Sequence, residues 1–512
     1  MKFLTICMIL LMLLTGCVKA DKNDNTPENI ENVQKNESIE NIENIENVQT
    51  KQENIFLEYE AEDATLLGRA TIKEANDIKF VDKLEQDGDG LEFEIEIEKE
   101  GFYDINVISK TVDGTYKENY LRIDGEDMGT VSVESITFTD SIAKRIYLNE
   151  GVHTVSIMKF WGWTQIDKLE IKSSPVISED RFEVEPVLAN LNASDNAKRL
   201  MAYLCDMYGE KIISGQYCDT GMYGKENEVI HKVTNGKYPA ILGLDMMDYS
   251  PSRAAKGTNS KAVDYAIEYW EAGGIVTFCW HWNAPEKYLT GQWYSGFYKE
   301  HTNIDLAKIM NGEDKEGYDF LMEDIDAIAE QLIRLKEADV PVLWRPLHEA
   351  SGGWFWWGNA GADAYKELYK LLYDRLTNEY ELNNLIWVWN GQDKEWYPGD
   401  EYVDIIGEDI YPGEKVYTPQ TSKYYDVLEY TQTKKMVVLS ENGCLFDPDL
   451  AVRDGAMWGY FGTWGGEFVV SSGSVNSLSE QYTEEEMVKK VYEHENVITR
   501  DELPDLSNYP VN

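Results

Sequence analysis

The sequence predicts a multidomain protein in which an all-β, jelly-roll-like sandwich precedes an α/β domain folded as a (β/α)8 barrel. Two patterns predict this order. Residues 55–175 contain short segments that alternate polar and apolar side chains and are separated by turn residues. Residues 176–512 contain eight apolar segments of strand length, with amphipathic helical stretches between most of them, which is typical of a closed parallel barrel.

The N-terminal segment predicts export. Lys2 supplies a positive charge, and the apolar stretch at residues 3–14 is too short to cross a bilayer comfortably. Residues 14–17 resemble the bacterial lipobox, which implies cleavage before Cys17 and lipid attachment to it. We therefore expect residues 1–17 to be a signal peptide, and the mature chain to be an extracellular, cell-surface bacterial lipoprotein that reaches the membrane only through Cys17. The alternative is an ordinary signal peptide with a chance cysteine.

Residues 18–54 are rich in Glu, Asn, Gln and Lys and contain almost nothing to bury, so they predict a disordered tether. The whole chain carries a formal net charge of −46, which argues against nucleic acid and anionic membrane surfaces as partners. It also contains 15 Trp and 32 Tyr, whose flat faces suit stacking on sugar rings. Large barrel cores bury many aromatic residues as well, so composition leaves both readings open.

Five alternating segments predict strands of the sandwich, at residues 91–97, 103–108, 120–123, 145–148 and 153–158. The eight apolar segments that predict the barrel strands lie at residues 211–215, 239–244, 274–280, 340–347, 385–389, 403–407, 435–440 and 456–464. Clear amphipathic helical stretches include residues 320–338 and 364–380. Eight strands over this length favour one closed barrel over two smaller sheets.

The cysteines beyond the signal peptide and Cys17 lie in the predicted barrel. They are Cys205, Cys218, Cys279 and Cys444. They form no Cys-x-x-Cys pair, which makes a zinc knuckle improbable. The sequence leaves open whether they form one or two disulfides or remain buried as small apolar side chains.

Two glutamates fall at predicted C-terminal ends of barrel strands, where such barrels carry their catalytic residues. Glu349 follows the fourth segment and precedes a loop that contains glycines and four aromatic residues, and Glu441 follows the seventh segment. Because the chain has 93 acidic residues, either glutamate alone is more simply a salt-bridged surface residue. The strand tip, the adjacent His348 and the aromatic loop together favour a sugar site.

Two carboxyl groups that face one glycosidic bond have a defined chemistry. One stays ionised and attacks the anomeric carbon, while the other stays protonated, donates its proton to the leaving oxygen and then activates water. Burial and neighbouring charges separate the two pKa values and so assign the roles. Carboxyl groups about 5–5.5 Å apart give retention of configuration, and a wider separation gives inversion.

Residues 180–505 resemble glycoside hydrolase family 26, whose members are mostly retaining endo-β-1,4-mannanases. The resemblance rests on residues 344–349 with Trp354 five residues further on. It implies that Glu349 is the acid/base and Glu441 the nucleophile. The sugar-site residues that it also implies are His281, Trp293, His348, Trp354, Tyr411 and Trp464, with Tyr411 hydrogen-bonded to the nucleophile. The chain departs from the family pattern at Ala350-Ser351 and at Asn442, which concerns the detail of the subsites.

Residues 55–172 resemble carbohydrate-binding module family 35, or the related family 6, through residues 58–64 and 161–167. The resemblance implies a structural calcium ion held by Glu60, Glu62 and Asp167. Oxygen ligands suit that ion, although a solvated acidic face is the alternative. Trp161 and Trp163 are the candidates for stacking on sugar, unless one of them packs in the core.

The combined prediction is a monomeric endo-β-1,4-mannanase that hydrolyses mannan, galactomannan or glucomannan by double displacement. No His-Glu-x-x-His or similar pairing occurs, so we expect no cofactor for catalysis. The alternatives are a β-1,3-1,4-glucanase or β-1,3-xylanase of the same family, or a non-catalytic surface protein that binds polysaccharide.

Overall fold

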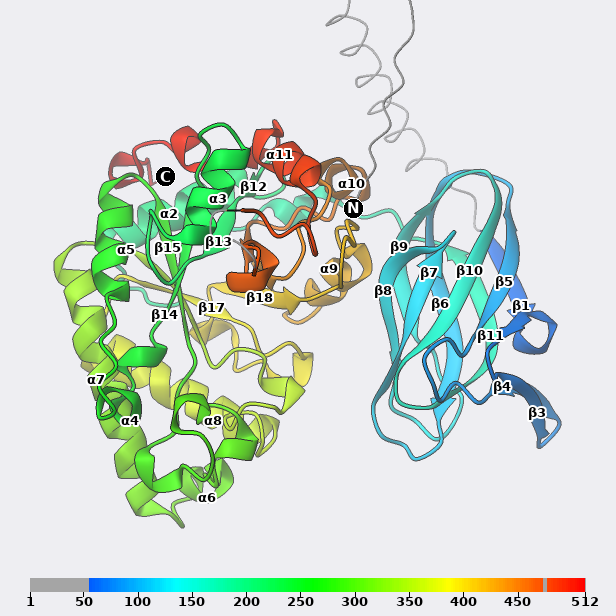
Figure 1. Ribbon diagram of the computed structural model, residues 1–512, viewed down its shortest axis with the longest axis horizontal. Coiled ribbons are helices and arrows are strands. Elements are labelled where there is room, and N and C mark those ends of the chain that lie inside the picture. The colour runs from blue at the N-terminus through cyan, green and yellow to red at the C-terminus, as the bar shows by residue number, and fades with distance from the viewer. Residues whose placement is uncertain (1–54, 473–476, 512) are drawn as a thin grey trace, which may run out of the picture. The chain divides into compact units, whose positions relative to one another are not determined.

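The computed structural model describes residues 55–472 and 477–511 (Figure 1). The predicted signal peptide at residues 1–17 and the predicted tether at 18–54 lie outside the described residues. Within the described part, no helix is both long and apolar enough to cross a membrane.

The sandwich consists of two antiparallel sheets packed face to face (Figure 1). One sheet has the order β3-β4-β11-β6-β9, with β1 paired to β11, and the other has the order β2-β5-β10-β7-β8. The strands are β1 (Phe56–Glu60), β2 (Thr65–Leu67), β3 (Thr71–Ala75), β4 (Ile78–Asp82), β5 (Gly90–Ile97), β6 (Gly101–Thr111), β7 (Lys117–Ile123), β8 (Glu126–Val133), β9 (Ile142–Leu148), β10 (Gly151–Trp161) and β11 (Thr164–Ser173).

Alternation of side chains explains which strands the sequence predicts. In β5, Leu91, Phe93 and Ile95 are buried between the sheets, whereas Glu94 and Glu96 are exposed. The five predicted segments all form strands. The structure adds six more, including β3, in which all five residues are exposed and no apolar period is present to detect.

Eight parallel strands, β13 to β20 in order, close into the predicted barrel. They are β13 (Gly215–Tyr217), β14 (Ile241–Asp245), β15 (Ile275–Trp280), β16 (Val342–Pro346), β17 (Leu385–Trp389), β18 (Ile405–Ile410), β19 (Met436–Asn442) and β20 (Phe461–Thr463). The helices are α2 (Asp195–Met207), α3 (Lys225–Val233), α4 (Pro251–Ala254), α5 (Ala262–Glu271), α6 (Leu306–Met310), α7 (Lys315–Glu337), α8 (Ala362–Tyr373), α9 (Thr421–Val427), α10 (Pro448–Asp454) and α11 (Glu485–Glu493).

The first and the eighth predicted strands differ most from the structure. The first predicted strand is mostly β12 (Ile212–Ile213), which pairs with β21 (Val497–Ile498) outside the barrel, while β13 begins two residues later. The eighth is shorter than predicted, because residues 456–460 owe their apolar character to packing rather than to a continuous strand. Trp458, for example, is fully buried and donates its indole N–H to the Pro419 carbonyl at 2.8 Å. Helix α8 ends at Tyr373, and a π-helical turn, Asp374–Glu379, continues it.

The four cysteines of the barrel are all free thiols, so no disulfide forms among them. Cys218, Cys279 and Cys444 are buried and Cys205 is partly buried. Burial raises the pKa of the Cys205 thiol to about 12, which keeps it protonated and unreactive at neutral pH. Of the two readings left open by the sequence, the structure therefore supports small, buried apolar side chains.

Candidate active site

Glu349 lies on a strained turn at the end of β16. Its φ of 53° and that of Leu347, 54°, place both residues in the left-handed region that side chains other than glycine rarely occupy. The backbone N–H of Glu349 donates to the Asn390 carbonyl at 2.7 Å, which fixes the turn to the next strand tip. Such backbone strain costs about 1–3 kcal/mol per residue and gathers at functional sites.

Glu441 lies near the end of β19, where the pairing with β18 is irregular. The register shifts between Glu408 and Asp409, so that Asp409 pairs with Glu441. An extra residue in one strand redirects side chains locally. The Glu441 side chain is buried and accepts hydrogen bonds from the Tyr411 hydroxyl and from the Arg345 guanidinium.

The two candidate glutamates meet at the mouth of the barrel. One carboxylate oxygen each of Glu349, Asp409 and Glu441 lies within 4.8 Å of the others. This separation agrees with the spacing of about 5–5.5 Å in retaining glycosidases and leaves no room for the water molecule that an inverting enzyme places between its carboxyl groups.

Arg345 holds the anionic side of this group together. Its fully buried guanidinium donates to Asp409 at 2.6 Å, to the Asn390 amide oxygen at 2.7 Å and to the Tyr217 hydroxyl at 3.0 Å, in addition to Glu441. The planar fork of an arginine suits several acceptors at once, which a lysine cannot match. Arg345 therefore fixes the position of the Glu441 carboxylate and compensates its charge.

The two glutamates have different electrostatic surroundings. Burial raises the pKa of Glu349 to about 7, and repulsion by Glu441 contributes in the same direction. Against this, Trp354 donates its indole N–H to Glu349 at 2.9 Å and stabilises the ionised form. A carboxyl group with a pKa near 7 can donate a proton at neutral pH, whereas Glu441 is paired with a permanent cation.

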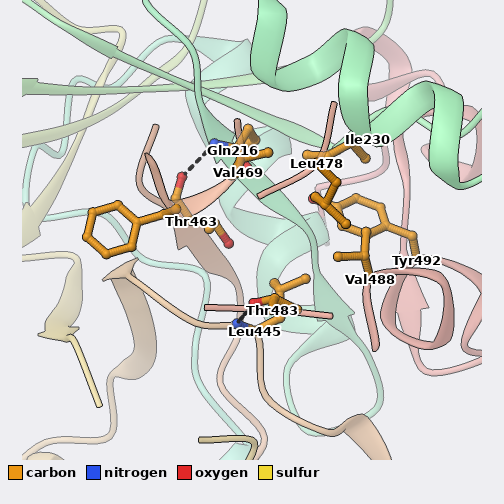
Figure 2. A pocket seen from close by; sticks show the side chains of 10 residues that line it. Gln216, Ile230, Leu445, Thr463, Val469, Leu478, Thr483, Val488 and Tyr492 are labelled. Carbon is orange, nitrogen blue, oxygen red and sulfur yellow. Dashed lines mark hydrogen bonds between the residues drawn. The ribbon is translucent and has the colours of Figure 1, made fainter. Parts of the chain in front are cut away.

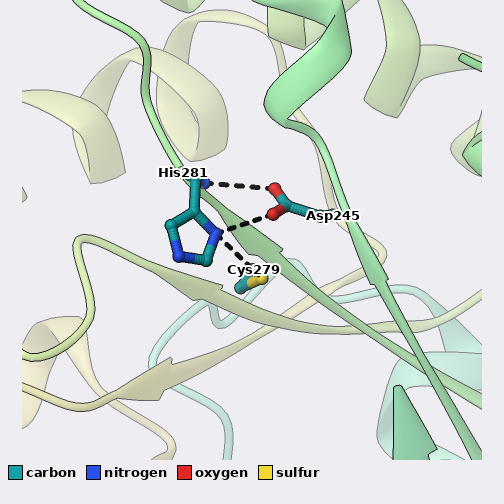
Figure 3. A group of neighbouring side chains, drawn as sticks. All are labelled: Asp245, Cys279 and His281. Carbon is teal, nitrogen blue, oxygen red and sulfur yellow. Dashed lines mark hydrogen bonds and ion pairs between the residues drawn. The ribbon is translucent and has the colours of Figure 1, made fainter. Parts of the chain in front are cut away.

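His281 and His348 lie beside this pair, with 3.3 Å between their Nε2 atoms. Figure 3 shows how Asp245, at the end of β14, holds His281: its carboxylate accepts from Nδ1 at 2.7 Å and from the backbone N–H at 3.1 Å. Burial alone lowers the pKa of His281, but the Asp245 carboxylate outweighs it and raises that pKa above its usual value. Burial holds the pKa of His348 well below its usual value, so this imidazole is neutral.

Cys279 lies next to this histidine, with its thiol 4.0 Å from Nδ1 of His281 (Figure 3). The thiol, the imidazole and the Asp245 carboxylate are close enough to share a metal ion. Their donor atoms already have other uses, because Asp245 is hydrogen-bonded to His281 and the thiol donates to the Leu244 carbonyl at 3.7 Å. Asp245 therefore serves to orient His281 through hydrogen bonds to its ring and its backbone.

The predicted stacking residues of the barrel divide into two groups. Trp354 is 41% exposed beside Glu349, and Trp464 packs 4.9 Å from the Tyr217 ring and 5.8 Å from the His281 ring. Trp354 therefore borders Glu349 directly, and Trp464 borders Tyr217 and His281, which contact Arg345 and His348. Trp293 lies in the loop after β15 against Tyr294, and no contact joins it to either candidate glutamate within the described chain.

The barrel domain also contains a small hollow that neither of the two glutamates lines. It encloses about 10 Å³ between β13, β20 and α11, and Figure 2 shows its largely apolar lining, which includes Val488 and Tyr492. Gln216 donates to the Thr463 carbonyl at 3.0 Å, and its Oε1 finds no partner among the described residues. A space of this size holds about one water molecule and is too small for a sugar.

The sandwich places its two candidate tryptophans differently. Trp161 is 62% exposed at the end of β10. Trp163 is partly buried, donates its indole N–H to Asp82 at 2.7 Å and has the Lys83 ammonium 5.1 Å from its ring centre. Trp163 is therefore held by its own domain, and of the two only Trp161 presents an open face.

The carboxylates expected to bind calcium gather without sharing one strand. Glu60 ends β1 and Glu62 lies in the 3-10 turn Ala61–Asp63, so the two carboxylates do not alternate along one strand. Burial raises the pKa of Asp167 in β11, and repulsion by Glu60 and Glu62 adds to this while Lys168 opposes it. Oε2 of Glu62 is buried and has no hydrogen-bond partner among the described residues, as a cation ligand would be. Glu60, Glu62 and Asp167 do not form one of the described groups whose ligand atoms lie within 4.8 Å of one another, and the calcium site stays a prediction.

Comparison with known proteins gives the family. The model of glycosyl hydrolase family 26 matches residues 189–502, which is more than half of the chain, and the model of carbohydrate binding module family 35 matches residues 57–174. The chain belongs to glycosyl hydrolase family 26. Both predicted resemblances and the predicted architecture of this family 26 protein are confirmed.

Relatives match along both domains of the family 26 chain. A mannan endo-1,4-β-mannosidase of Thermothelomyces thermophilus is 39% identical, over 87% of this chain and 90% of the relative. Mannan endo-1,4-β-mannosidase B of a Piromyces species is 34% identical, over 87% of this chain and 77% of the relative. The crystal structure of a Podospora anserina GH26-CBM35 β-(1,4)-mannanase is 36% identical with a TM-score of 0.62, over 88% of this chain and 99% of that one.

Sequence reasoning missed the residues that support the family 26 site. The sequence does not distinguish Arg345, Asn390 and Tyr217, and for Asp245 and Asp409, which lie near predicted strand ends, it predicts only hydrogen bonds to substrate hydroxyl groups. Tyr217 and Asp245 end their strands, Asn390 directly follows one, and Arg345 and Asp409 lie one residue before a strand end. A charged or amide residue that ends an apolar strand was therefore the available signal.

Proposed function

We propose that this chain is a retaining endo-β-1,4-mannanase that hydrolyses mannan, galactomannan or glucomannan. The observation that carries the proposal is the close approach of the Glu349 and Glu441 carboxylates at the barrel mouth, within 4.8 Å, with Glu441 paired to Arg345. The substrate class is taken from relatives whose names give mannan as the polymer that they cleave.

The mechanism follows from the two environments. Glu441, oriented by Arg345 and Tyr411, attacks the anomeric carbon and forms a glycosyl-enzyme, while protonated Glu349 gives its proton to the departing oxygen. Glu349, now a carboxylate, takes a proton from water, which attacks the same carbon and releases Glu441. Trp354, hydrogen-bonded to Glu349, and Trp464 are proposed to stack on the sugar rings, with His281 and His348 contacting hydroxyl groups beside them.

Substrate choice separates this proposal from its alternatives. Purified protein is incubated with β-mannan, glucomannan, lichenan and β-1,3-xylan, and new reducing ends are measured, with Glu441→Ala as the inactive control. We expect rapid release from mannan and glucomannan only. Faster cleavage of lichenan or β-1,3-xylan would assign the glucanase or xylanase alternative. If the protein binds these polymers but releases no new reducing ends, the non-catalytic alternative is correct.

The domain boundaries, the monomeric state and the remaining site assignments belong to the same proposal. The sandwich is proposed to bind the polymer and to hold a structural calcium ion through Glu60, Glu62 and Asp167. Two sites on one chain raise the local concentration of polymer at the barrel. Addition of EDTA should then lower the Tm of the sandwich in calorimetry, and Ca²⁺ but not Mg²⁺ should restore it. An unchanged Tm would contradict the calcium assignment.

Attachment to the cell surface through Cys17 rests on residues 1–17, since the long matches are to fungal proteins. Expression in a bacterium that processes lipoproteins, followed by detergent partition and mass spectrometry of the N-terminal peptide, tests it. We expect a lipid-modified Cys17 in the detergent phase and a water-soluble product from Cys17→Ala. Cleavage at another residue without lipid would contradict the proposal.

A further inference from the structure

The outer face of one sandwich sheet contains a hollow of about 420 Å³, where β7 and β10 run side by side. Leu121 and Ile123 of β7 point into the core, so the alternate residues Tyr120 and Arg122 point away from it. The volume falls within the range of roughly 300–1,000 Å³ that is usual for small-molecule sites. Trp161, the exposed tryptophan at the end of β10, does not line this hollow.

Two aromatic rings form an apolar platform in this hollow. The rings of Tyr120 and Phe160 lie 4.3 Å apart, inclined by 36°, and Phe160 remains 39% exposed. Phe160 lies two residues after Met158, which also lines the hollow, so the alternation of side chains along β10 places both residues on this face. Two neighbouring rings on an outer face suit stacking against the C–H face of a sugar ring.

Polar groups of both signs surround the platform. The Arg122 guanidinium lies 5.5 Å from the centre of the Tyr120 ring, and its nearest carboxylate, Asp127, is 3.9 Å away. Most of its N–H groups therefore remain available to a ligand. Lys159 is 3.3 Å from the Asp87 carboxylate, so the two charges largely compensate. Donors and acceptors around a nearly neutral platform match the hydroxyl groups of an uncharged sugar better than those of an anion or a cation.

We propose that this hollow binds a chain of β-linked neutral hexoses, stacked on Tyr120 and Phe160 and hydrogen-bonded by Arg122, Lys159 and Asp87. The site differs from the one expected at Trp161 and Trp163. The identity of the hexose, mannose, rests on the proposed function, whereas the location of the site does not.

The test uses the full chain with Glu441→Ala, which keeps the polymer intact, and measures the dissociation constant for soluble glucomannan by affinity electrophoresis. Because the barrel also binds this polymer, the readout is the difference between variants that share the same barrel. Tyr120→Ala with Phe160→Ala should raise the dissociation constant at least about tenfold, equivalent to about 1.4 kcal/mol. Arg122→Gln, which leaves the platform in place, should raise it severalfold.

Phe56→Ala, which removes an exposed ring from the other sheet, is the matched control and should bind like the parent. Calorimetry of each variant verifies that the sandwich still folds, and hydrolysis of a short soluble mannooligosaccharide by the same variants with Glu441 restored should be unchanged. Unaltered binding by both the double variant and Arg122→Gln would overturn the site.

A negatively charged polymer serves as the last test ligand. Polygalacturonate should not be retarded, and its preferential retardation would overturn the neutral ligand class. If lichenan is retarded through Tyr120 and Phe160 while the barrel fails to cut mannan, the proposed function fails and this binding site stands.

Discussion

Replacement of Arg345 by lysine tests the support of the nucleophile. The change keeps one positive charge but removes the fork that reaches Glu441, Asp409, Asn390 and Tyr217 together. A single ammonium group cannot span these acceptors, so at least one carboxylate loses a charge-assisted hydrogen bond. The loss of such a bond costs about 1.5–3 kcal/mol.

If that loss falls on the transition state, kcat/KM drops by roughly 10- to 150-fold, since about 1.4 kcal/mol corresponds to a factor of ten. Initial rates on soluble glucomannan measure the change, and calorimetry shows that the barrel is still folded. The matched control is Arg375→Lys, because Arg375 forks onto Asp326 at 2.8 Å in a partly exposed pair. That pair should contribute at most about 1 kcal/mol to stability and nothing to activity. Activity of the Arg345→Lys protein within about threefold of the parent would refute the reasoning.

Three further outcomes are expected. Tyr411→Phe removes the hydroxyl that donates to Glu441 and should lower kcat about 10- to 100-fold, measured against Tyr417→Phe; equal rates would contradict the contact. Glu349 must be protonated to act as the acid and has a pKa of about 7, so kcat/KM should fall tenfold per pH unit above pH 7; a constant rate to pH 9 would exclude it as that acid. Burial raises the pKa of Asp324 to about 7, and it accepts from Trp282 at 2.7 Å. The folded state thus binds this proton more tightly, stability should fall as pH rises from about 4 to 7, and Asp324→Asn should remove much of that fall in Tm.

The barrel was predictable because each strand is a short apolar run between polar loops. The first strand was misplaced for a physical reason: β13 contains Gln216, a buried polar residue whose amide N–H groups donate to the backbone carbonyls of Tyr217, Thr463 and Trp464. In the sequence, the polar residue Gln216 resembles the end of a strand rather than its centre. The neighbouring apolar pair of β12 therefore attracted the assignment.

The two glutamates were found because they follow apolar strands and precede unusual loops. Arg345 was missed because it lies inside such a strand, where its function depends on carboxylates from β18 and β19 that are distant in sequence. Trp161 and Trp163 illustrate the same limit in the sandwich. The residues are two positions apart and alike in sequence, yet only the contact with Asp82 shows that Trp163 is held in place.

The stereochemistry of hydrolysis tests the central claim most directly. Proton NMR of a mannooligosaccharide digest, recorded in the first minutes before the anomers equilibrate, identifies the configuration of the sugar that is released first. Carboxylate oxygens of Glu349 and Glu441 within 4.8 Å of each other predict that the β-anomer appears first and the α-anomer only later, by mutarotation. Initial release of the α-anomer would mean that water attacks the sugar directly, and would contradict the assignment of Glu441 as the nucleophile.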